Sequence, residues 1–305
     1  ISAVDELIDL NFLDNDRKLT PLGRRLAALG CSPYLAKAML YAIFLKCSDP
    51  VLSIVSMLEL NSDVFINSPD VDRSAVNRAK LDQMGSTFSD HLLLAKIYEQ
   101  YSECIEKSKI SYTKNLIVNS GKSESNLVDD FCRQNYLNAQ ALALASELKS
   151  LFSKQLQSAG IVDENDDLLR QNSDFNQNRR NFQFITAALA AGLEKNFENR
   201  RNIQFRAGCL DLLKNSLNDD MEKSKYQNDV PSNSDPPSKK HDFYWFNTFE
   251  RVLSVDGRTF RLEDLGLVNP LLVLLFSGFD LELYGNSNII LHPSKDFRFQ
   301  LPSAA

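Results

Sequence analysis

The apolar residues between positions 1 and 193 recur mainly three or four positions apart, which is the spacing of helices with one buried face. Within 19–60, three apolar runs each open on a small polar residue followed by proline: Thr20-Pro21, Ser32-Pro33 and Asp49-Pro50. Side chains of this kind accept hydrogen bonds from the unpaired N–H groups of a first helical turn, where proline has no such group. The pattern predicts three short helices with well-defined starts.

Further helices are expected over 4–10, from about Ser74, over 89–108, over 128–160 and over 181–193. The run 128–160 has an expected apolar face made of Leu142, Leu144, Leu148, Leu151, Phe152 and Leu156. Lys149, Lys154 and Gln155 fall off that face. After residue 242 the pattern changes to short strand-prone segments. The expected fold class is mainly α with a C-terminal β part.

Several segments resemble one known family. Residues 19–27 (LTPLGRRLA), 35–40 (LAKAML) and 49–54 (DPVLSI) are similar, in the same order, to the junction of the winged-helix and ratchet domains of DEAH/RHA-type (DExH-box) RNA helicases. Residues 131–138 (FCRQNYLN) resemble the ratchet motif of that family, and residues 297–302 (FRFQLP) resemble its closing strand. The resemblance implies a partial winged helix, a helical ratchet bundle and an OB-like barrel.

On this resemblance, residues 1–30 are the C-terminal part of the winged helix, and 31–160 are the helical ratchet (HA2-like) domain. Residues 161–180 are a linker, and 181–305 are the OB-like domain with a disordered insertion at about 215–240. This insertion lacks the family's usual barrel motif. Gly30 also departs from the family, which has proline there. Because the chain opens on Ile inside a helical pattern, we expect a fragment of a longer protein or an incomplete gene model.

Composition restricts the partners and the compartment. No apolar run approaches the ~20 residues that span a bilayer, so no membrane partner is expected. The net charge of −6 argues against an autonomous nucleic-acid-binding domain, although phosphate contacts depend on where cations cluster. The 5 cysteines are an odd number without close spacing, which predicts reduced thiols rather than disulfides or a zinc site. An intracellular location, cytoplasmic or nuclear, is expected.

The sequence contains no recognisable machinery for nucleotide hydrolysis. Gly121-Lys122-Ser123 looks like the end of a phosphate-binding loop, but Leu116 stands where its first glycine is required. No DExH motif is present, and His91, in a first helical turn, has no partner motif for a catalytic triad. We therefore expect no catalytic residue, no metal site and no cofactor in this chain. The resemblance implies that ATP and Mg²⁺ serve motor domains upstream of Ile1.

The candidate RNA-binding residues are cations and one aromatic side chain. They are Arg133, Lys149, Lys154, Tyr244, Arg258, Arg261 and Arg298. OB folds bind single strands with aromatic platforms and basic groove edges, which is why Tyr244 and the three later arginines are included. The alternatives stay open here: the lysines fit a solvated helix side equally well, and the aromatic residue fits a barrel core.

Two functions are compatible with these features. The first is the C-terminal accessory region of an ATP-dependent DExH-box RNA helicase, which helps to form the single-stranded RNA channel and a partner surface. Its partners would be single-stranded or structured RNA, the RecA-like motor domains of the same protein, and a ribosome or a regulatory protein. The second is a helicase-derived adaptor that binds protein and has no motor. The parent protein of the first hypothesis hydrolyses NTP, and this chain by itself is expected to be inactive.

Overall fold

The computed structural model describes residues 3–60, 62–87, 89–118 and 127–193 of the helical part. In the C-terminal third it describes residues 203–205, 245–253, 260–268, 272, 275–276, 281–284, 288–291 and 297–300. The helices are α1 (Ala3–Asp9), α2 (Pro21–Leu26), α3 (Pro33–Phe44), α4 (Ser48–Leu58), α5 (Arg73–Met84), α6 (Asp90–Val118), α7 (Leu127–Gln134), α8 (Ala139–Ser158) and α9 (Phe182–Gly192). Short 3-10 turns cover Gly85–Thr87 and Asp174–Asn176. Among the described residues, no helix is both long and apolar enough to cross a membrane.

The three predicted proline starts differ in the structure. The Thr20 side chain accepts a hydrogen bond from the N–H of Gly23 at 2.9 Å, so the first cap is confirmed. Ser32 precedes Pro33 as expected but makes no capping bond with its side chain. The third prediction is wrong, because α4 begins at Ser48 and Asp49 already lies in its first turn. The Asp49 carboxylate instead contacts a side chain of another helix, as described below.

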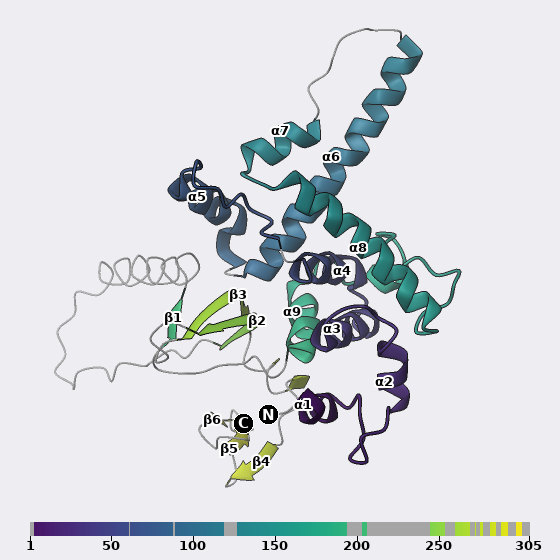
Figure 1. Ribbon diagram of the computed structural model, residues 1–305, viewed down its shortest axis with the longest axis vertical. Helices are drawn as coiled ribbons and strands as arrows, with labels where there is room; N and C mark the ends of the chain where they lie inside the picture. The colour runs from purple at the N-terminus through teal and green to yellow at the C-terminus, as the bar shows by residue number, and fades with distance from the viewer. Residues whose placement is uncertain are drawn as a thin grey trace, which may run out of the picture.

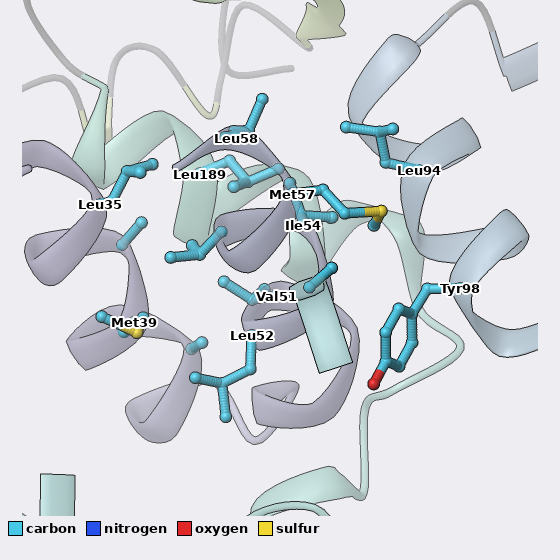
Figure 2. Packing of buried hydrophobic residues seen from close by; sticks show 14 of the residues in the cluster. Leu35, Met39, Val51, Leu52, Ile54, Met57, Leu58, Leu94, Tyr98 and Leu189 are labelled. Carbon is cyan, nitrogen blue, oxygen red and sulfur yellow. The ribbon is translucent and has the colours of Figure 1, made fainter. Parts of the chain in front are cut away.

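Helix α4 is the centre of the hydrophobic core. Its side chains Val51, Leu52 and Ile54 are at most 1% exposed. Figure 2 shows them between α3, which carries Leu35 and Met39, the helix α6 and the α9 residue Leu189. Because apolar residues cover nearly every side of α4, this short helix is enclosed by the others rather than lying on the surface.

The segment 128–160 is helical as expected, but a turn divides it into the separate helices α7 and α8. The chain turns at Tyr136, whose φ is 55°, a left-handed conformation. Leu137 then forms an isolated β-bridge with Phe65. The side chain of Asn138 restarts the helix by accepting bonds from the N–H groups at the start of α8. Contacts with a distant loop thus stabilise a break inside a helix-prone segment.

The buried stripe of α8 also differs from the predicted apolar face. Leu142, Phe152 and Leu156 are buried as expected. However, Leu144 and Leu151 are 48% and 46% exposed, and Lys149 is buried in their place. The expectation that Lys149 lies off the buried face is therefore wrong. The reason is a specific partner, described below, that hydrophobic periodicity does not reveal.

Residues 161–180, expected to be a linker, pack against the helical body. Asn176 is 2% exposed, and its side-chain oxygen accepts a hydrogen bond from the N–H of Asp49 at 2.7 Å. Its amide group donates to the carbonyl oxygens of Leu168 at 2.8 Å and Arg170 at 2.9 Å. Asn176 therefore caps α4 from a distant part of the chain and orders its own loop.

We expect Asn176→Ala to lower the free energy of unfolding by about 2–3 kcal/mol, because it leaves buried backbone groups without partners. Urea denaturation followed by circular dichroism measures this change. The matched control is Asn165→Ala, since Asn165 is exposed and its side chain bonds only to Asp163. Equal midpoints for the two variants would contradict the capping role.

Two glycines allow close backbone approaches within this body. A Cβ on Gly23 would lie 2.0 Å from the carbonyl oxygen of Phe12, which explains the glycine in LTPLG. A Cβ on Gly192 would lie 2.5 Å from the Cβ of Ala38. The second contact joins α9 tightly to α3, so α9 packs in the helical bundle although its sequence was grouped with the OB-like part.

The C-terminal strands form two small sheets beside the helices (Figure 1). In the first, β3 (Phe260–Val268) lies between β1 (Ile203–Phe205), to which it is parallel, and β2 (Trp245–Leu253), to which it is antiparallel. In the second, the antiparallel strands β4 (Leu281–Tyr284), β5 (Asn288–Leu291) and β6 (Phe297–Gln300) follow in chain order. The mainly helical class with a C-terminal β part is confirmed. The closed barrel remains a prediction, and the insertion at about 215–240 lies outside the described residues.

Candidate nucleic-acid interface

Lys149 lies in the helical core. Its ammonium group is 2.5 Å from the Oδ1 atom of Asp49 on α4 and 4.4 Å from the ring centroid of Tyr98 on α6. Only 7% of the Lys149 side chain and 17% of the Asp49 side chain are exposed. The lysine predicted to contact RNA phosphates therefore contacts an internal carboxylate and an aromatic ring in this structure.

This buried charge is balanced by its neighbours. Burial lowers the pKa of Lys149, and the Asp49 carboxylate opposes that change. Burial raises the pKa of Tyr98, whose hydroxyl donates to the Oγ of Ser146 at 3.1 Å. A second ion pair, between Arg179 and Glu99, joins the segment after Asn176 to α6 at 2.6 Å. The network connects α4, α6, α8 and residues 176–179. Its geometry is that of a structural contact that holds these segments together.

Two of the predicted cations are open to solvent. Arg133, in the last turn of α7, has a side chain that is 79% exposed and pairs with Asp130 one turn earlier. Lys154 is exposed on α8. Arg133 precedes the start of α8 and Lys154 lies near its end, so the two charges are separated by roughly 20 Å of helix. Both are available for phosphate contacts, but they do not form one site.

The remaining four candidates follow residue 242 in the sequence. Arg261 is on β3, opposite Val252 of β2 and Gln204 of β1. Arg298 is on β6, opposite Ile290 of β5, in the other sheet. Tyr244 and Arg258 lie outside the described residues. The four therefore stay predictions, and the described strands place Arg261 and Arg298 in different sheets.

The described residues offer no metal centre or activated nucleophile. They contain no group of three or more His, Cys, Asp or Glu side chains that could hold a metal ion. Burial raises the pKa of Cys31 and of Cys47 to about 12, and that of Cys132 to about 11. These thiols are therefore protonated at neutral pH and are poor nucleophiles. His91 is buried in the first turn of α6.

A group of exposed aromatic and cationic side chains, none of them among the residues predicted from the sequence, lies where α3 ends and α9 begins. We call it the α3/α9 end and define it as residues 41–46 and 177–184. Phe44 is 69% exposed and Phe182 is 56% exposed. A signal was present in the sequence, because Phe182 and Phe184 are two positions apart and cannot share one buried helix face.

Two models of known protein families match the N-terminal part of the chain. Residues 3–31 match the winged-helix part of the helicase-associated domain (HA2), and residues 32–94 match its ratchet-like part. The two matches follow one another along α1 to α6. Residues 3–94 therefore contain winged-helix and ratchet-like helicase-associated (HA2) domains, which are similar to the C-terminal region of DExH-box RNA helicases.

The relatives are themselves helicases of this type. The chain is 29% identical over 195 residues to the DExH-box ATP-dependent RNA helicase DExH1 of Arabidopsis thaliana, covering 64% of this chain and 17% of that protein. It is 29% identical over 191 residues to the human ATP-dependent DNA/RNA helicase DHX36, covering 63% of this chain and 17% of the relative. With the ATP-dependent RNA helicase DHX30 of Gallus gallus the identity is 28% over 302 residues, covering 93% of this chain and 22% of the relative. The chain thus spans less than a quarter of the length of these relatives.

Proposed function

We propose that this chain is the C-terminal accessory region of an ATP-dependent DExH-box RNA helicase. In this role it helps to form the channel for single-stranded RNA and presents a surface to partners, while RecA-like motor domains of the same protein bind ATP and Mg²⁺. The observation that carries the proposal is the succession of winged-helix and ratchet-like HA2 matches over residues 3–94, with helicase relatives aligned beyond them.

The helical body supports this role mechanically. Buried contacts connect α3, α4, α8 and α9, and the Asp49–Lys149 and Arg179–Glu99 pairs add α6 and the segment before α9. Close-packed interiors of this kind transmit displacements as a unit rather than deforming locally. The exposed cations Arg133 and Lys154 are on the outside of this body, where they can meet a phosphate backbone.

We expect the chain to bind single-stranded RNA weakly and to hydrolyse no ATP, with or without RNA. Fluorescence anisotropy with a labelled oligouridine measures the first, and phosphate release measures the second. Replacing both Arg133 and Lys154 with glutamine should reduce the slope of log affinity against log salt by up to about 1.4, since each phosphate contact on a single strand contributes roughly 0.7.

RNA-stimulated ATP turnover by this chain would contradict the assignment of the motor to another part of the protein. Failure to bind RNA, combined with stable binding to a protein partner, would favour the motor-less adaptor. Uncharged substitutions of Leu144 and Leu151 serve as controls, because they change exposed side chains of α8 without removing a charge.

A further inference from the structure

We propose that the α3/α9 end is a docking site for one or two bases of single-stranded RNA, with Phe182 as a stacking platform and Arg180 and Lys46 as phosphate contacts. This inference rests on the proposed RNA-binding function and adds a location for it outside the residues predicted from the sequence. Three features of the surface support it: the position of the two helix ends, the exposure of the aromatic rings and the chemistry of the neighbouring polar side chains.

Hydrogen bonds fix the two helix ends beside each other. The N–H of Asn178 donates to the carbonyl oxygen of Lys46 at 2.8 Å, and its side-chain amide donates to that of Leu45 at 2.9 Å. The ammonium group of Lys46 is 3.2 Å from the Oε1 atom of Gln177. The cation after α3 and the polar segment before α9 therefore belong to one surface.

A shallow hollow lies on this surface. It is lined by Gln177, Asn178, Arg180, Asn181, Phe182 and Gln183. Amide side chains can pair with the hydrogen-bonding edges of unstacked bases, and an aromatic ring can stack on their faces. This lining is more polar than that of a typical small-molecule pocket, which consists mainly of apolar and aromatic groups.

The aromatic rings are exposed despite their size. Phe182 is 56% exposed and Phe44 is 69% exposed, whereas the nearby Ile185 is 2% exposed. The ring centroid of Phe44 is 6.5 Å from that of Tyr41 at an interplanar angle of 80°, an edge-on contact that holds the ring in place. Exposed aromatic side chains on a single-strand-binding surface accept bases of any type, because every base has a π face.

The charges favour an anionic ligand. Among the described residues, neither Lys46 nor Arg180 is part of an ion pair, and both are exposed. The neighbouring Arg179 pairs with Glu99, and the Asp174 carboxylate accepts a hydrogen bond from Gln177 but keeps its negative charge. Arg180 lines the same hollow as Phe182, and Lys46 contacts Gln177 of that hollow, so two cations outnumber the single Asp174 carboxylate where a phosphate of a stacked nucleotide would lie.

The test compares Phe182→Ala with Leu151→Ala in the complete chain, using anisotropy with labelled oligouridine. Leu151 is similarly exposed, at 46%, but lies on α8. We expect Phe182→Ala to weaken binding about tenfold, in line with the loss of one stacked base, and Leu151→Ala to change it less than twofold. Arg180→Gln should weaken binding and also reduce its salt dependence.

A second measurement distinguishes stacking from charge. In a Trp245→Phe background, Phe182→Trp places the single tryptophan at the site, and its emission should be quenched by oligouridine but not by an abasic strand of the same length. If Phe182→Ala leaves RNA binding unchanged, the proposed site is wrong, but the proposed function is not contradicted. That result would then favour a protein partner for the α3/α9 end. Absence of any RNA binding by the unmodified chain would overturn both.

Discussion

Asp49→Asn is expected to lower the free energy of unfolding by about 3–5 kcal/mol at neutral pH, because it leaves the ammonium group of Lys149 buried without its counter-ion. The Lys149 side chain is only 7% exposed, and its ammonium group is 2.5 Å from the Asp49 carboxylate. The contact with the Tyr98 ring remains in the variant, but it supplies less stabilisation than a full negative charge. Urea denaturation measures the loss.

The pH dependence of this variant should also change. Burial already lowers the pKa of Lys149 in the folded state, and the Asp49 carboxylate limits that shift. Without the carboxylate the folded-state pKa falls further below the unfolded value of about 10.4. Between the two values the unfolded chain binds more protons, so the stability of Asp49→Asn should rise from pH 7 toward pH 10, more steeply than that of the unmodified chain.

Lys149→Met is the matched control for this pair. It removes the buried charge and keeps most of the side-chain volume, and it leaves Asp49 in the first turn of α4, where the helix dipole favours a negative charge. We expect a loss of only about 1–2 kcal/mol, and a double variant with Asp49→Asn that is more stable than Asp49→Asn alone. A flat pH profile for Asp49→Asn, parallel to that of Lys149→Met, would contradict the pairing.

Gly192→Val is expected to separate α9 from α3 and to lower the free energy of unfolding by about 3 kcal/mol. A Cβ at this position would lie 2.5 Å from the Cβ of Ala38 and 2.7 Å from its Cα and N atoms. Overpacking of side chains alone costs about 1–3 kcal/mol, and here the obstacle includes backbone that cannot rotate away. Thermal and urea denaturation followed by circular dichroism measure the change.

Gly30 provides the comparison for Gly192. A Cβ at Gly30 would be no nearer than 3.8 Å to its closest neighbour, the Nε2 atom of Gln155, at the end of a flexible side chain. Gly30→Ala should therefore be neutral or stabilise the fold by up to about 1 kcal/mol, because it reduces the conformational freedom of the unfolded chain. If Gly192→Val were as stable as Gly30→Ala, the close approach of α9 to α3 would be wrong.

Local sequence predicted what depends on neighbouring residues. The cap at Thr20, the helix from about Ser74 and the helix of 181–193 are set by residues within a turn or two, and the structure contains them as α2, α5 and α9. The resemblance to DExH-box RNA helicases was also correct, because it depends on ordered short motifs that the HA2 family matches include. The closed barrel, the insertion and the roles of Tyr244 and Arg258 stay predictions.

Tertiary structure decided what depends on partners far along the chain. Lys149 was expected on a solvated side, yet it is buried because a carboxylate 100 positions away lies opposite it. Asp49 was expected to cap α4, yet Asn176, 127 positions away, accepts the bond from its N–H. The exposed rings at the α3/α9 end likewise depend on two helix ends that meet only in the folded chain. Periodicity records whether a side chain is apolar, but it contains no information about which polar group a distant segment will place against it.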